Sequence, residues 1–338
     1  MIKKPRLLLV MLLMLAFFAC STDSRKADVS DIKIDFKFNR FEKDLFAGSD
    51  PFSQEKLNSL RQQYGSFTDV FIHNVLSIAP APDSVIVFNL QQFIYDTEVK
   101  DIYRLTDSVF HDTGAIEAGL KDFLKHYHYY YPEKPVPGIA TYISAFNYAV
   151  ITTDSTIGIG LDMFLGSHIN YYPRLGIPLY IFTKFSPEYI VPSAIKAWFQ
   201  SDNEQSQVKN ELLSQLVYQG KLLYYINAMA PELNDTLKTG YSQSQLKWCV
   251  ENEASIWSFF IENKLLFNTD PSQFSKFVNE GPATNGFPKE APGRIGAYVG
   301  WQIVNAYMKK NKEASLDDLL KENDAQKILE VSGYKPQK

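Results

Sequence analysis

Cysteine is scarce in this chain of 338 residues, which contains only Cys20 and Cys249. Two cysteines cannot form the disulfide framework of a small secreted domain or a cysteine-rich zinc site. The zinc-binding patterns HExxH, HxxEH and CxxC are also missing from the sequence. The chain therefore has no recognisable catalytic zinc motif, and we expect it to use no metal and no cofactor.

Concentrated positive charge is missing as well. The formal net charge is −4, and the 34 lysines and arginines form no cluster along the chain. Binding to nucleic acid relies on a basic patch or stripe, so the composition disfavours nucleic acid as a partner. No repeat of fixed period occurs, which disfavours a solenoid.

Near its start the chain has an uncharged apolar run, Leu7 to Ala19, which is shorter than the roughly 20 residues that span a bilayer. It follows a basic start, MIKKPR, and precedes Cys20, an order typical of a secretory signal. The stretch LAFFAC resembles a bacterial lipobox, although Phe17 and Phe18 depart from its strictest form. We expect residues 1–19 to be a signal peptide, Cys20 to carry lipid and residues 20–30 to form a flexible tether. The alternative is a plain signal peptide followed by an unmodified cysteine.

Strands and helices are predicted in separate blocks of the remaining chain. DIKIDFKF, residues 31–38, alternates apolar and charged residues as a half-buried strand does. Further strands, joined as hairpins, are predicted at 138–146, 148–153 and 156–165. Helical periodicity is found at 53–64, 69–77, 83–95, 98–110 and 115–129, and almost everywhere after Pro173. This order predicts an α+β fold in a single domain over residues 31–338, with a small antiparallel or mixed sheet before about residue 172 and a helical part from about 173.

Glycines and histidines provide two weak motifs. His126 and His128 are two positions apart, so they lie on opposite sides of a helix and are more simply structural than metal-binding. Gly296 and Gly300 are one helical turn apart and do not match a nucleotide-binding loop. We expect their shared face to pack closely against the predicted helix 207–229, whose apolar stripe contains Gly220.

Glu253 is the one carboxylate predicted at the centre of an apolar helical face. Its neighbours on that face include Cys249, Ile256 and Phe260. A carboxylate in such a place is either paired with a cation or functional. A structural ion pair is the simpler of these two interpretations.

Several longer blocks resemble the gliding motility lipoproteins of the GldB type from Bacteroidetes. The blocks are IGIGLDMFLG, YIVPSAIKAWF, VYQGKLLYYINAMAPEL, GYSQSQLKWCVENEASIW, APGRIGAYVGWQIVNAYM and the closing GYKP. The resemblance implies an envelope lipoprotein that is needed for gliding and linked to the motility and type IX secretion machinery. It also implies a distant relation to zincin-like metallopeptidases, which carry HExxH on one helix and a glutamate on a later helix.

The resemblance implies a degenerate site in place of the peptidase zinc. Gly220, Lys221 and Tyr224 then lie where a peptidase has its metal-binding helix, and Glu253 is the remaining glutamate. We expect Glu253 to pair with Lys221, with Arg294 or with both, so that a lysine replaces the metal.

Two functions follow as hypotheses. The first is a non-catalytic pseudoenzyme scaffold, anchored in the membrane by lipid on Cys20, that supports gliding through contacts with other envelope proteins. The alternative is a zinc-dependent hydrolase with an unrecognised metal site, for instance His126, His128 and Asp162. The missing zinc motif favours the first hypothesis.

The predicted anchor can be tested by the substitution Cys20→Ser. Because no other residue is a plausible lipid site, we expect the variant to become soluble or to accumulate as the precursor. Detergent phase partitioning measures the change. A variant that still partitions with membranes like the wild type would show that a peripheral contact provides the anchoring.

Overall fold

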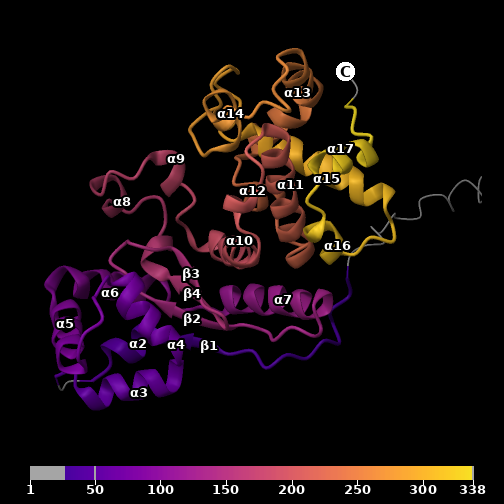
Figure 1. Cartoon of the computed structure of the whole chain (residues 1–338). Coiled ribbons are helices and arrows are strands. Elements are labelled where there is room, and N and C mark those ends of the chain that lie inside the picture. Colours follow the sequence, from indigo (N-terminus) through magenta and orange to yellow (C-terminus); the bar gives the residue numbers. More distant parts are fainter. Residues whose placement is uncertain (1–26, 49–50, 337–338) are drawn as a thin grey trace, which may run out of the picture.

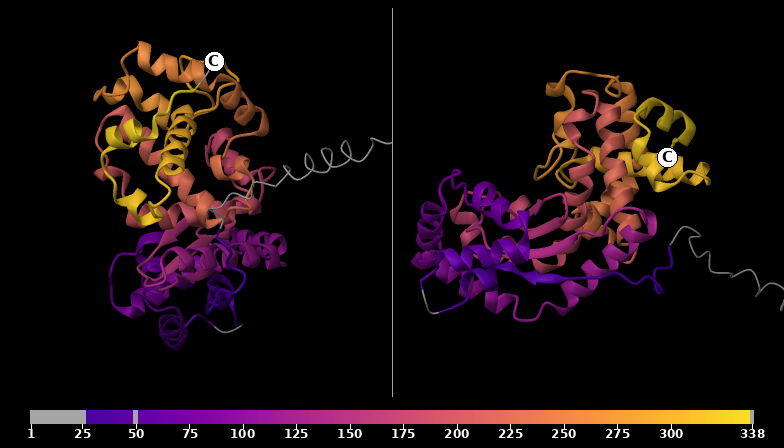
Figure 2. Two further views of the ribbon diagram at one scale, coloured as in Figure 1. Left: turned by 90° about the vertical axis from the view of Figure 1, so that its right-hand side faces the viewer. Right: turned by 60° about the horizontal axis from the view of Figure 1, so that its bottom comes forward.

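The structure is a computed structural model that describes residues 27–48 and 51–336. Within these residues sixteen α-helices accompany one four-stranded sheet, so the fold class is α+β as predicted. The first part of the chain and the sheet form the lower half of the molecule, and the later helices form the upper half (Figures 1 and 2). No helix in the described part of the chain is both long and apolar enough to cross a bilayer.

The sheet is mixed, with the strand order β1-β2-β4-β3. Its strands are β1 (Phe38–Arg40), β2 (Gly138–Tyr142), β3 (Val150–Thr152) and β4 (Thr156–Gly160). β2 runs parallel to both β1 and β4, and only β3 and β4 form an antiparallel hairpin. The prediction of hairpins throughout is therefore wrong, because the chain passes from β2 to the edge strand β3 before it returns as β4.

The predicted strand over residues 31–38 is also wrong in its extent. Its side chains do alternate between half-buried and exposed positions, and Ile34 and Phe36 pack against the main core. Only Phe38 to Arg40 pair with a neighbour, since β2 begins at Gly138 and its second residue, Ile139, lies opposite Phe38. The alternating pattern thus indicates that one side of this segment is buried. An extended segment shows that pattern whether or not it pairs with a neighbouring strand.

The last residues of the predicted tether belong to the folded part. Val29 is buried, and its carbonyl accepts a hydrogen bond of 3.3 Å from Lys125 Nζ. Residues 1–26, which include the predicted signal peptide and Cys20, lie outside the described residues.

β4 shows how the sheet separates two apolar cores. Its sequence alternates isoleucine and glycine, and Ile157 and Ile159 point into the larger core. The opposite face belongs to a smaller core that includes Phe67 and Tyr142. A Cβ at Gly158 would lie 2.6 Å from the Phe67 ring, so glycine is needed there for the aromatic ring to reach the sheet.

The helices between β1 and β2 lie close to their predicted positions, and most of them cover one face of the sheet. They are α2 (Phe41–Phe46), α3 (Gln54–Tyr64), α4 (Ser66–Val70) with a π-helical turn (Phe71–Val75), α5 (Asp83–Tyr95), α6 (Thr97–Val109) and α7 (Gly114–Tyr130). α2 to α5 supply most of the smaller core, whereas α7 contributes Leu120, Phe123 and Leu124 to the larger one.

The chain after β4 contains no further strand among its described residues. A 3₁₀ turn (Leu161–Phe164) replaces the end of the strand predicted to reach residue 165. The helices that follow are α8 (Tyr171–Arg174), α9 (Leu179–Phe182), α10 (Ile190–Asp202), α11 (Leu212–Met229), α12 (Asp235–Thr239), α13 (Gln243–Glu262), α14 (Pro271–Val278), α15 (Ile295–Lys310), α16 (Leu316–Lys321) and α17 (Ala325–Ser332).

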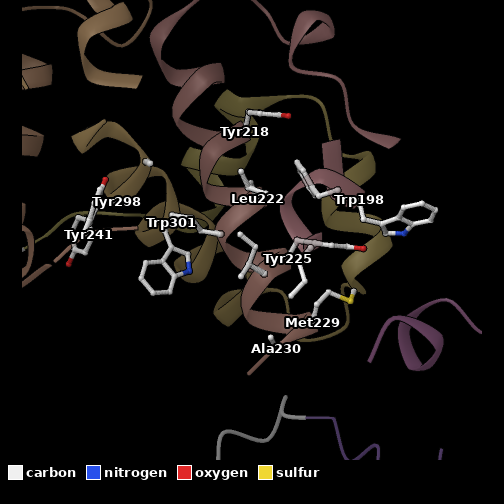
Figure 3. Close-up of a cluster of buried hydrophobic side chains, with 14 of the residues drawn as sticks. Trp198, Tyr218, Leu222, Tyr225, Met229, Ala230, Tyr241, Tyr298 and Trp301 are labelled. Carbon is white, nitrogen blue, oxygen red and sulfur yellow. The ribbon is translucent and has the colours of Figure 1, made fainter. Parts of the chain in front are cut away.

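α11 is the central helix of the upper half. It is buried on almost every side and contacts α7, α10, α14, α15, α16 and α17. Figure 3 shows Tyr218, Leu222, Tyr225 and Met229 spaced along this helix within the core. A helix that is apolar all round is expected only in such a central position.

Candidate functional site

α11 and α15 approach closely at three glycines, and at two of them, Gly220 and Gly300, the backbones touch. A Cβ at Gly220 would collide with the carbonyl of Gly300, and one at Gly300 would collide with the carbonyl of Leu216. A Cβ at Gly296 would lie 2.5 Å from Leu216 Cδ2 and 2.7 Å from the Phe277 carbonyl oxygen. The structure thus places Gly220, Gly296 and Gly300 in one close contact between the two helices that the sequence suggested.

Lys221, the next residue along α11, points toward the C-terminal helices. Its Nζ donates hydrogen bonds to the main-chain carbonyls of Leu320, at 3.2 Å, and Glu322, at the end of α16. Carbonyls at the end of a helix have no partner within that helix, so the lysine satisfies them. Burial lowers the pKa of Lys221 to about 8.

Glu253 has tyrosines as its partners. The hydroxyls of Tyr298 on α15 and Tyr334 near the end of the chain donate to its two carboxylate oxygens, at 2.9 Å and 2.8 Å. Burial and the adjacent carboxylate raise the pKa of both tyrosines. The two hydroxyls thus provide each oxygen of this half-buried carboxylate with a hydrogen-bond donor.

The predicted pairing of Glu253 with Lys221 or Arg294 is therefore not found. Lys221 is bonded to carbonyls near α16, and Arg294 forms its ion pair with Glu280 instead. The physical reason is the direction of each side chain. Lys221 leaves α11 toward α16 and α17, whereas Glu253 on α13 faces the tyrosine side of α15.

Arg294 lies immediately before α15 in a left-handed backbone conformation, with φ of 60°. Its Nη2 donates to the Thr239 carbonyl at 2.7 Å, and its Nη1 lies 3.4 Å from Glu280 Oε1. The side chain is almost fully buried, and its Nε has no hydrogen-bond partner. A buried donor without a partner is costly, which makes this end of α15 unusual.

Two lysines join Arg294 around Glu280, and sequence reasoning missed both of them. Lys184, just after α9, donates to Glu280 Oε2 at 2.9 Å. Lys196 on α10 interacts electrostatically with the other three side chains, and burial together with the nearby positive charges lowers its pKa to about 8. The charges of Arg294, Lys184 and Lys196 outweigh burial and lower the pKa of Glu280 to about 2. We call these four residues the basic cluster. The only signal in the sequence was Lys196 inside the apolar stretch SAIKAWF.

His126, His128 and Asp162 are not brought together as a metal site. His126 Nδ1 lies 3.0 Å from the carbonyl oxygen of Asp122, one turn back on α7. Asp162 is fully buried after β4, and its Oδ2 accepts bonds from the main-chain N–H groups of Ser144 and Phe146, at 3.1 Å and 2.7 Å. Among the described residues no three histidine, cysteine, aspartate or glutamate side chains form a group that could hold a metal.

Comparison with known proteins identifies the family. A family model described as "Gliding motility protein GldB" matches residues 22–336. The chain belongs to the GldB gliding motility family. The match includes the basic cluster, Glu253 and the glycine contact between α11 and α15, and the family's name links the chain with gliding motility. No curated protein and no solved structure matches this GldB chain.

The family's short name also marks its members as lipoproteins. This name agrees with a lipid-anchored protein of the cell envelope. The match begins at residue 22, two positions after Cys20.

The glycine contact predicts the effect of a single added methyl group. Gly300→Ala should destabilise the fold by about 1–3 kcal/mol or more, because its Cβ meets the α11 backbone and the helices must separate. Urea denaturation measures the change. Gly138→Ala is the control, since a Cβ there makes only ordinary contacts of 3.8 Å and 3.9 Å. Equal stability of the two variants would show that the helices are not in backbone contact.

Lys221→Met should reduce stability by about 1–3 kcal/mol near neutral pH, because two part-buried carbonyls lose their donor. The folded-state pKa of about 8 lies below the ordinary 10.5. Between these two pH values the unfolded wild type therefore binds more protons than the folded wild type. As the pH rises through that window, the free energy of unfolding of the wild type should increase relative to that of the variant.

Denaturation curves at several pH values measure this difference. Lys247→Met is the control, because Lys247 lies at the surface in an ion pair with Glu251. A wild-type advantage that stays constant from pH 7 to pH 10 would contradict a lowered pKa.

Proposed function

We propose that this GldB chain is a non-catalytic envelope lipoprotein that supports gliding through contacts with other proteins, on a scaffold derived from a peptidase. The observation that supports this most directly is the chemistry of α11. Where the resemblance to zinc peptidases implies metal-binding histidines, α11 has Gly220 against α15 and Lys221 bonded to main-chain carbonyls.

The surroundings of Glu253 support the same proposal. In a zincin-like arrangement this glutamate is the metal ligand on the later helix. Here both of its oxygens accept tyrosine hydroxyls, so they are already engaged in structural hydrogen bonds. A site for hydrolysis also needs a group that activates water, and neither Lys221 nor Gly220 has the metal-binding chemistry for that role.

A role through protein contacts is supported by an exposed apolar arm. The segment with α8 and α9 projects from the body of the molecule (Figure 1). Leu175 and Leu179 in this arm are 54% and 65% exposed. Large apolar side chains gathered on a projecting segment are typical of interaction surfaces.

Complementation in a gliding host that lacks its own GldB gene tests the proposal. The full-length chain should restore movement of single cells on glass, and Cys20→Ser should not. The double variant His126→Gln with His128→Gln should restore movement as well as the wild type. These changes remove two of the three ligands in the alternative metal site without changing formal charge at neutral pH.

The biochemical part of the test uses the purified full-length protein. Stoichiometric zinc in that protein, together with loss of gliding in the histidine variant, would favour the zinc-dependent hydrolase. A photo-cross-linking residue at position 179 should capture envelope proteins in cells, with exposed position 88 on α5 as the control site. Failure to capture any protein from position 179 in gliding cells would contradict a role of this arm in protein contacts.

A further inference from the structure

The basic cluster has more positive than negative charge. Lys184, Lys196 and Arg294 surround one carboxylate, that of Glu280. With three cations and one anion, the formal charge of the cluster is +2. Collecting like charges in a place with little water is unfavourable unless a counter-charge is present.

The cluster also has hydrogen-bond donors without acceptors. Lys196 has no hydrogen bond or ion pair with the described residues, and its interaction with Glu280 is electrostatic only. Arg294 Nε is buried and without a partner. Lys184 donates one bond to Glu280, which leaves its other ammonium N–H groups for a further acceptor. Donors from three separate segments thus remain available in one cluster.

The cluster is held by the fold and reaches the surface. Arg294 is fixed by the Thr239 carbonyl, and its own carbonyl accepts a bond of 2.8 Å from the buried Tyr241 hydroxyl. Lys184 and Glu280 are 25% and 35% exposed at their side chains. A small ion can therefore approach from the side of these two residues and meet positive groups that are already in place.

We propose that the basic cluster is a binding site for a phosphate group, held by Lys184, Lys196 and Arg294 beside Glu280. The excess of two positive charges matches a phosphate, which carries about −1.5 to −2 near neutral pH. A single carboxylate would neutralise only half of that excess. Arginine and lysine together are common ligands of phosphate in proteins. The site does not depend on the gliding role or on the absence of a zinc site.

Titration calorimetry of the full-length protein in detergent micelles, with inorganic phosphate in a chloride buffer, tests the site. We expect saturable binding that Lys196→Gln weakens about tenfold or more. Lys247→Gln, which removes an equal charge from an exposed ion pair on α13, should bind like the wild type. Lys196→Gln should remain folded, because Lys196 is only half-buried and burial disfavours its charge.

Glu280→Gln gives a test in the opposite direction. It removes the one negative charge from the cluster, so phosphate should bind more tightly than in the wild type. A purely structural role for these residues predicts no such gain. Absence of saturable phosphate binding, equal affinity in wild type and Lys196→Gln, or weaker binding in Glu280→Gln would overturn the proposal.

A comparison of three ligands distinguishes a soluble phosphate from the headgroup of a lipid. Glycerol 3-phosphate and a short-chain phosphatidic acid are compared with inorganic phosphate. Tighter binding of phosphatidic acid identifies a lipid headgroup, and equal binding of all three identifies a soluble phosphate. Acetate that binds as tightly as phosphate would contradict the assignment to a doubly charged group.

Discussion

The backbone contact between α11 and α15 is the constraint on which the upper half of the molecule depends. Without side chains at Gly220 and Gly300, the two helices approach until a carbonyl of one lies where a Cβ of the other would be. Glycine within a helix costs about 1 kcal/mol relative to alanine. Packing of the surrounding apolar side chains offsets this cost, because close approach brings many atoms into contact at once.

Once α15 is fixed against α11, its other side chains have little freedom. Tyr298 reaches Glu253 on α13, and Arg294 at the start of the helix meets Thr239 and Glu280. The end of the chain is held in the same way. Lys221 binds the carbonyls that follow α16, and the Tyr334 hydroxyl meets Glu253. Polar contacts at three places thus depend on one backbone contact between helices.

Local signals made part of this structure predictable. The helices between β1 and β2 follow their periodicity, and Gly296 and Gly300 fall on one face because they are one turn apart. Contacts between residues far apart in the sequence left no comparable pattern in it. The alternation of residues 31–38 could not show that β2 begins at Gly138. Tyr334 lies 81 residues beyond Glu253, and the basic cluster comes from four separate segments, so neither has a spacing that a sequence pattern can reveal.

Native-state hydrogen exchange measures most directly whether the α11–α15 contact organises the structure. Amides that exchange only when the whole protein unfolds identify the most stable part of a fold. If the contact has this role, the amides around Gly220 in α11 and Gly300 in α15 will be the slowest of the chain, with free energies of exchange equal to that of global unfolding. Faster exchange in these two helices than in β2 and β4 would contradict the account and place the stable centre in the sheet.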